Sequence, residues 1–129
     1  MADKRFLPRF HLINATSMGA SVTSAATRIE YIDNIGYEVL WSAGTSPVGT
    51  IAIQVSNDHD ETDNGVVLTV GNWQDVGVVD SAGVAPTISG ASGDHFISLN
   101  QLPWKWVRLV YNRTSGTATL DVWITGKGV

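Results

Sequence analysis

The sequence predicts an all-β domain: about eight antiparallel strands in a two-sheet sandwich of the jelly-roll kind. Apolar and polar residues alternate in several short segments, as in strands that bury one face. Turn-forming stretches rich in Gly, Ser and Asn separate these segments, and no segment has a convincing helical period. An immunoglobulin-like sandwich is the alternative, because Trp41 could serve as a core tryptophan without a disulfide.

The first half of the chain contains four predicted strands. The first covers residues 10–14 and the second covers residues 28–33. The third and fourth, at residues 37–41 and 50–56, flank a turn at residues 44–49 that contains Pro and Gly. Their short connection predicts that the third and fourth strands form an antiparallel hairpin.

The middle of the chain alternates between loops and strands. A polar loop at residues 57–65 precedes a strand at 66–70, which continues after a break into residues 73–79. Residues 80–93 are mostly small and predict a flexible loop at one end of the sandwich. Another strand follows at residues 94–100.

The C-terminal stretch has the clearest β pattern. Aromatic and β-branched residues dominate 104–111, and a turn signal follows at 114–117. In residues 118–125 one set of alternating side chains is apolar, and Trp123 belongs to the opposite set. We therefore expect a second hairpin here, with Trp123 on the outward face.

Composition limits the possible functions. The chain has 129 residues, no cysteine and a net charge of −4. This length suits one domain, and the acidic balance argues against nonspecific nucleic-acid binding. No apolar run approaches a membrane span, and the first residues lack the apolar core of a signal peptide. We expect synthesis and folding in a cytoplasm, with no membrane partner.

The chain divides into an N-terminal arm, residues 1–8, and a β-sandwich domain, residues 9–129. Lys4, Arg5 and Arg9 supply three of the eight basic residues, and Pro8 interrupts regular strand pairing. Such an arm either frays into solvent or reaches onto a partner, and its basic residues would suit an acidic one.

The acidic loop at residues 57–65 is the most site-like segment. Asp58, Asp60 and Asp63 are the candidate ligands for an irregular calcium site, because carboxylates suit that cation. The helix-loop-helix calcium motif fails, since Gly71 stands where a bidentate glutamate is required. The alternative is a solvated loop whose charges discourage edge pairing. We expect no bound metal or cofactor.

The sequence also lacks the patterns of common catalytic sites. His11, His59 and His95 are too far apart in sequence for metal-ligand spacing. We find no nucleophile elbow and no glycine-rich phosphate loop, so we expect no enzymatic activity.

Five tryptophans are many for so short a chain: Trp41, Trp73, Trp104, Trp106 and Trp123. All five can be core residues if both sheets are covered. Otherwise an outward tryptophan, with Trp123 the candidate, can anchor a protein interface or stack on a sugar ring.

Several segments resemble small structural proteins of tailed-bacteriophage virions. They are residues 10–20, 54–58, Leu102–Pro103 with 107–111, the turn at 114–117, and Gly126-Lys127-Gly128. The resemblance covers most of the chain, and its motifs are structural rather than catalytic. It implies a virion component made in a bacterial host.

Within that group, a short all-β protein without catalytic signals is most similar to capsid decoration, or cement, proteins. The resemblance implies a homodimer or homotrimer that bridges major-capsid subunits. It also implies a gripping arm at Lys4, Arg5, Phe6 and Leu7, with Arg9 and Trp123 as further contacts, and the loss of shell binding when residues 1–8 are removed. A tail or baseplate component is the alternative within this group. A carbohydrate-binding β-sandwich is the alternative from another class.

Overall fold

The computed structural model describes residues 6–30, 32–62, 64–78, 86–100 and 103–128. Within these ranges every regular element is a strand, and the predicted all-β class is confirmed. The strands are β1 (Phe6–Ser17), β2 (Val22–Thr23), β3 (Thr27–Arg28), β4 (Asn34–Ser56), β5 (Asp60–Glu61), β6 (Val67–Thr69), β7 (Gln74–Val76), β8 (Thr87–Ile88), β9 (Gly93–Leu99) and β10 (Trp106–Lys127). No helix in the described ranges is long and apolar enough to cross a membrane.

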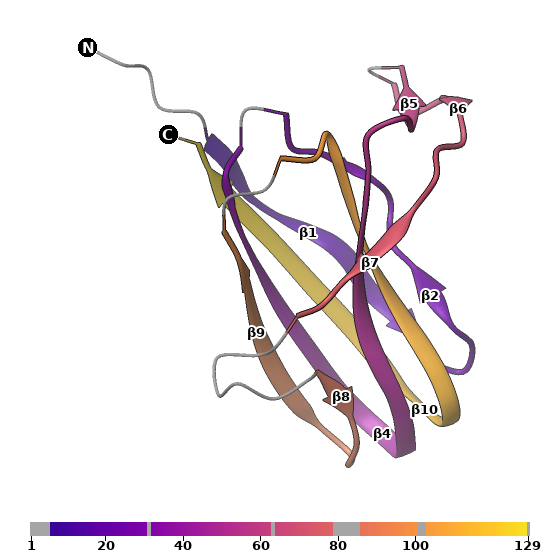
Figure 1. The fold of residues 1–129 in the computed structure, drawn as a ribbon. Coiled ribbons are helices and arrows are strands. Elements are labelled where there is room, and N and C mark those ends of the chain that lie inside the picture. The colour runs from indigo at the N-terminus through magenta and orange to yellow at the C-terminus, as the bar shows by residue number, and fades with distance from the viewer. Residues whose placement is uncertain (1–5, 31, 63, 79–85, 101–102, 129) are drawn as a thin grey trace.

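The fold is organised around a two-stranded ribbon made by β4 and β10. These strands pair antiparallel along their whole lengths, from Asn34 opposite Lys127 to Ser56 opposite Trp106. Both strands turn back at the same end of the molecule, so the ribbon folds over on itself (Figure 1). Each strand therefore contributes one half to each of two stacked layers.

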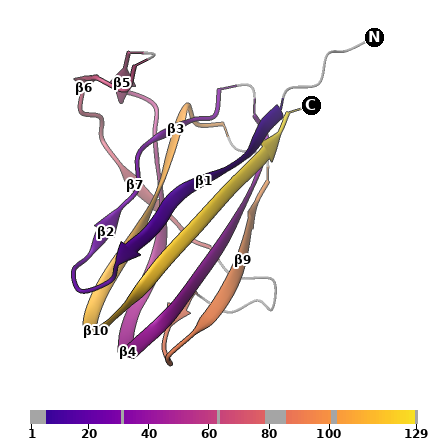
Figure 2. The same ribbon diagram turned by 180° about the vertical axis from the view of Figure 1, so that it is seen from behind.

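Shorter strands complete the two layers. In the first layer, β9 pairs with the N-terminal half of β4, and β1 pairs with the C-terminal half of β10. In Figure 2 this layer faces the viewer, with β1, β10, β4 and β9 lying in that order. In the second layer, β7 and β8 pair with the other half of β4, while β2 and β3 pair with the other half of β10.

The core lies between the layers and follows the predicted alternation. On β4 the inward residues include Tyr37, Val39, Ile51 and Ile53. On β10 the inward set changes from odd to even positions across the fold of the ribbon: Val107, Leu109 and Tyr111 in one layer, and Ala118, Leu120, Val122 and Ile124 in the other. Register shifts between Arg113 and Thr119 cause this change, because a one-residue slip exchanges the two faces of a strand.

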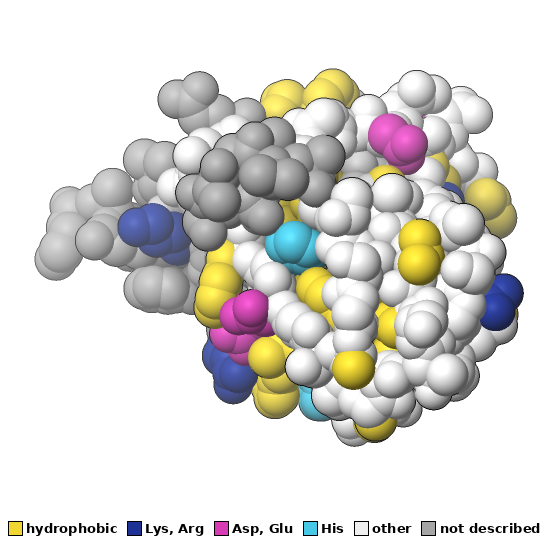
Figure 3. All heavy atoms as spheres, turned by 90° about the horizontal axis from the view of Figure 1, so that it is seen from below, with side chains coloured by type: hydrophobic (Ala, Val, Ile, Leu, Met, Phe, Trp, Pro, Cys, Tyr) yellow, Lys and Arg dark blue, Asp and Glu magenta, His cyan; other side chains and the backbone are white. Residues whose placement is uncertain are grey.

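The fold of the ribbon depends on backbone conformations that few residues adopt. Ala43 and Ser46 have positive φ angles of 54° and 48°, and Gly116 has φ 72°. A side chain at Gly116 would collide with the backbone carbonyl of Ser46, so glycine permits the close approach of the two strands. Figure 3 views this end of the molecule, where most of the surface is uncharged and polar.

Two predicted hairpins are wrong in their pairing. The segments at 37–41 and 50–56 are halves of β4, and those at 104–111 and 118–125 fall largely within halves of β10. Neither pair of halves is joined as a hairpin, since each half of one long strand pairs with a half of the other. Alternation marks which residues face inward but does not identify the partner strand.

Other boundaries differ from the prediction. The first strand begins at Phe6, not at residue 10, so Phe6 to Pro8 belong to β1. The predicted strand at 28–33 shrinks to β3, and Ile29 and Ile32, which a strand would place on opposite faces, are both buried. The predicted strands at 66–70 and 73–79 shorten to β6 and β7, and the loop at 80–93 contains β8 in its described part.

Candidate functional site

The outer face of the β1–β10–β4–β9 layer carries a groove built from two neighbouring cross-strand rows. One row runs Phe96, Glu38, Trp123 across β9, β4 and β10. The second row runs Ser98, Gly36, Thr125 across the same strands. Because Gly36 has no side chain, the sheet is hollow at the centre of the second row.

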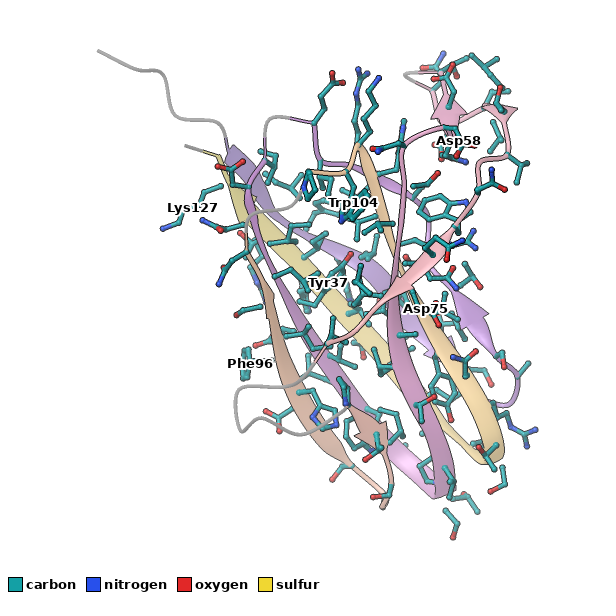
Figure 4. All side chains as sticks on the ribbon, viewed as in Figure 1. Tyr37, Asp58, Asp75, Phe96, Trp104 and Lys127 are labelled. Carbon is teal, nitrogen blue, oxygen red and sulfur yellow. The ribbon has the colours of Figure 1, made fainter. Side chains whose placement is uncertain are left out.

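The hollow above Gly36 has a volume of about 230 Å³ and mostly apolar walls. It continues past Gly36 into a shallower trough of about 390 Å³ that ends among Asn34, Asn100 and Lys127. The groove therefore has aromatic side chains at one end and amide, hydroxyl and ammonium groups at the other. Figure 4 shows that Phe96 and Lys127 project from the same side of the molecule.

Contacts from β1 hold Trp123 in place. The His11 ring stacks on the indole at 4.1 Å, and the two planes lie within 3°. Asp121 holds His11 through a 2.8 Å contact to Nε2 and also accepts a hydrogen bond from the Ala15 amide. The Trp123 wall is thus ordered before any ligand arrives.

The Arg9 guanidinium group lies at the aromatic end of the groove, beside Trp123. The Arg9 guanidinium carbon lies 3.8 Å from the centroid of a Trp123 ring, within cation–π range. Arg9 also reaches the Glu38 carboxylate at 3.7 Å. The positive and negative charges offset each other, so this end of the groove has little net charge.

The outer face of the second layer differs, because the chain covers it. Residues between β4 and β7 bring His59 and Trp73 over this face, and the His59 ring lies 5.1 Å from both Trp73 and Trp106. Arg108 lies 4.2 Å from the centroid of a Trp73 ring. His59 is buried and contacts Glu61 at 2.7 Å. These aromatic side chains pack against one another and cover this part of the face.

The acidic loop uses its first carboxylate to hold the chain. Asp58 accepts hydrogen bonds from the Asn72 amide, the Asn72 side chain and the Ser56 hydroxyl. The Asn72 N–H, together with the Ser56 hydroxyl, lowers the pKa of Asp58 below its ordinary value. Asp60 is exposed on β5, and Asp63 lies outside the described residues. Among the described residues no three His, Asp or Glu side chains are placed to hold a metal ion.

A second apolar surface lies on the small β5–β6 sheet, which projects from the body away from the fold of the ribbon (Figure 1). β6 and the residues that flank it expose four apolar side chains by 48–78%: Val66, Val67, Leu68 and Val70. We call these four residues the hairpin strip. Such a run of exposed branched residues is unusual for a surface that faces only water.

The structure brings together some of the predicted contact residues and not others. Arg9 and Trp123 meet at the groove, and Trp123 is half-buried on the outward face as predicted. Leu7 packs against the core from β1. Phe6 is also in β1, where its backbone pairs with Lys127 of β10, so neither residue belongs to a free arm. Lys4 and Arg5 lie outside the described residues.

Sequence analysis missed the other half of the groove. Phe96 is 51% exposed on β9, and its position between the inward-facing His95 and Ile97 could have revealed it. Gly36 gave no such signal, because its role depends on the strands at either side.

No protein-family model and no curated protein matches the chain. Among solved structures, it is similar to the SPBc2 prophage-derived protein YomS, with a TM-score of 0.57 and 8% sequence identity. That match covers 97% of this chain and 96% of YomS. A chain of the infectious bursal disease virus Gx strain matches with a TM-score of 0.36 and 12% identity, over 99% of this chain and 41% of that one.

The match to YomS shows a shared fold over nearly the whole of both chains. At 8% identity it transfers no site residue. The match to the viral chain is too weak to bear on either fold or function.

Proposed function

We propose that this chain is a non-enzymatic structural protein of a tailed-bacteriophage virion. In the specific form of the proposal, it decorates the capsid and bridges neighbouring major-capsid subunits. The observation that carries the proposal is the hairpin strip, which presents four branched apolar side chains on and beside a projecting two-stranded sheet.

The hairpin strip is suited to binding protein. Burying an exposed Val or Leu side chain contributes about 1.5–3 kcal/mol when burial is complete. A two-stranded sheet is marginally stable by itself, so a partner that covers the strip would also stabilise the sheet. Exposed Asp60 borders the strip, and the whole chain carries a charge of −4. The complementary surface is therefore apolar with a basic margin.

The fold similarity supports the bacteriophage origin that this proposal assumes. YomS is described as prophage-derived, and its fold matches this chain almost end to end. The resemblance of the sequence to small phage virion proteins points the same way.

The proposed mechanism is additive binding. Each copy buries a moderate area across a joint between capsid subunits, a site that exists only in the assembled shell. A dimer or trimer would engage several subunits at once and gain avidity without new kinds of contact. Light scattering on the purified protein measures this state, and we expect a discrete dimer or trimer.

Cosedimentation with empty shells of the phage that encodes the chain tests the proposal. We expect the wild-type protein to sediment with the shells and to protect them against heat. The double variant Leu68→Ser with Val70→Thr should bind about tenfold more weakly, because both side chains belong to the strip. Both residues are exposed, so the variant should fold normally.

Val48→Thr is the matched control, since Val48 is 43% exposed at the distant fold of the ribbon. Its binding should stay within about twofold of wild type. Equal binding by the double variant and wild type would exclude the strip as the contact. Immunogold labelling confined to tails would replace decoration by a tail or baseplate role, and absence of the chain from purified particles would overturn the virion role itself.

A further inference from the structure

We propose that the groove on the outer face of the β1–β10–β4–β9 layer binds a chain of neutral pyranose sugars. The first sugar ring would lie above Gly36, against the row of Phe96, Glu38 and Trp123, and the chain would continue toward Asn34 and Asn100. This site is separate from the hairpin strip, so the inference does not depend on the proposed virion role.

The hollow beside the aromatic row suits a six-membered ring. Phe96 and Trp123 lie two strands apart, which is about 10 Å at the backbone. Glu38 stands between them in the same row, so a sugar ring above Gly36 would pack at about 3.5–4 Å against the side of this row, in contact with the edges of Phe96 and Trp123. The hollow of about 230 Å³ above Gly36 provides the space.

The polar groups of the groove match sugar hydroxyls. Ser98 and Thr125 line both parts of the groove, and Asn34 and Asn100 line its far end. Hydroxyl and amide groups both donate and accept hydrogen bonds, as sugar hydroxyls do. A purely apolar ligand would leave these groups without partners and lose affinity for that reason.

The charges of the groove favour a neutral ligand. Arg9 and Glu38 lie 3.7 Å apart and offset each other at the aromatic end. Both groups remain partly exposed and can still form hydrogen bonds with a ligand hydroxyl. An anionic or cationic ligand would have to compete with this ion pair.

The strands beneath the groove argue against a peptide added as a new strand. The floor is β4, which pairs with β9 at one edge and with β10 at the other. Its backbone groups are therefore occupied, and only side chains are available to a ligand. Peptide addition needs an unpaired strand edge, whereas a sugar needs none.

Titration of the ¹⁵N-labelled protein with maltohexaose, cellohexaose and chitohexaose, followed by NMR, tests the site. We expect at least one of them to give saturable shifts at the Trp123 indole and at the Gly36 and Ser98 amides. The Trp106 indole lies on the opposite face and should not shift. If none of the three oligosaccharides shifts the groove signals, the proposal is overturned.

Three variants sharpen the test. Phe96→Ala should weaken binding about tenfold, and Phe96→Tyr should restore it, because the aromatic ring provides the contact. Gly36→Ala should also weaken binding, since it raises the floor. Its added Cβ would meet only Thr125 Cγ2, at 3.6 Å, so the fold should accept it.

Val48→Ala serves as the exposed apolar control and should bind like wild type. Unchanged affinity in Phe96→Ala would overturn the proposal even if a sugar binds elsewhere. The Leu68→Ser, Val70→Thr double variant should retain sugar binding. Failure of the sugar test is therefore distinguishable from failure of the shell-binding test.

Discussion

The two outer faces of the sandwich come from the same pair of strands and yet meet different surroundings. On one face Trp106 and Arg108 of β10 lie under Trp73 and His59, which the segment after β4 brings over them. On the other face Trp123 of β10 lies beside Arg9, and the groove next to it is open. Both faces use a tryptophan with an arginine, but only one face is covered by the chain itself.

This difference shows that an outward aromatic residue has no fixed role. Trp106 is 8% exposed and contributes to packing, whereas Trp123 remains half-buried and forms a groove wall. The strand positions are equivalent, so the covering segment at residues 57–73 decides between a structural role and an available surface.

Substituting the two tryptophans gives the largest expected contrast. Trp106→Ala should lower the free energy of unfolding by about 3–5 kcal/mol, because a buried ring leaves a cavity. Trp123→Ala should lower it by about 1–2 kcal/mol, since the ring is partly exposed and loses mainly its stacking and cation–π contacts. Urea denaturation measures both. Equal losses would mean that the covering segment contributes little to the burial of Trp106.

The strand edges of the two layers provide a smaller contrast. The open layer ends in the continuous strand β1, while the covered layer ends in the fragments β2 and β3, which Ser24 connects to β10. The Ser24 hydroxyl accepts a hydrogen bond from the Leu109 amide at 2.9 Å and donates one to the Ala25 carbonyl. Ser24→Ala should cost about 1–3 kcal/mol of unfolding free energy, because a buried amide loses its partner.

Ser21→Ala is the control for Ser24→Ala. The Ser21 hydroxyl accepts a hydrogen bond from the Arg113 amide at 3.0 Å, but this site is exposed and water can replace it. The control should therefore change stability by less than about 1 kcal/mol. A loss in Ser21→Ala as large as that in Ser24→Ala would show that burial of the Leu109 amide is not the cause.

Asp58, near the start of the covering segment, gives the smallest expected effect on stability, and that effect depends on pH. Hydrogen bonds from Asn72 and Ser56 hold the pKa of Asp58 below its ordinary value of 3.8. A lowered pKa in the folded state stabilises the fold above the ordinary value, and this contribution is lost as pH falls through the folded-state pKa. Thermal unfolding of wild type and Asp58→Asn across acidic pH should show a weaker pH dependence in the variant. Parallel curves would exclude Asp58 as a source of acid sensitivity.

Sequence analysis predicted the class of fold and most of the buried faces. In the predicted strands at 37–41 and 50–56, the alternating apolar residues are all buried: Tyr37, Val39 and Trp41, and Ile51, Ile53 and Val55. Outward placement of Trp123 followed from the same pattern. These predictions succeed because burial on one face of a strand depends on local periodicity.

Pairing and coverage could not be read from the sequence. The turn signals at 44–49 and 114–117 are consistent with a hairpin, but they mark the places where one long ribbon folds back. Whether two segments join as a hairpin depends on which strand competes for their edges, and that competitor is distant in sequence. Likewise, the groove needs Phe96, Gly36 and Trp123 from three strands to lie side by side.

The sequence by itself therefore determined that this protein is an all-β sandwich without cysteines, with a net charge of −4 and one outward tryptophan near its C-terminus. Only the tertiary structure decided that Trp106 is covered, that Trp123 borders a groove and that the hairpin strip is exposed. The physical reason is the distance along the chain over which each feature is determined. Side-chain alternation depends on adjacent residues, whereas the segment that covers a face is distant in the sequence.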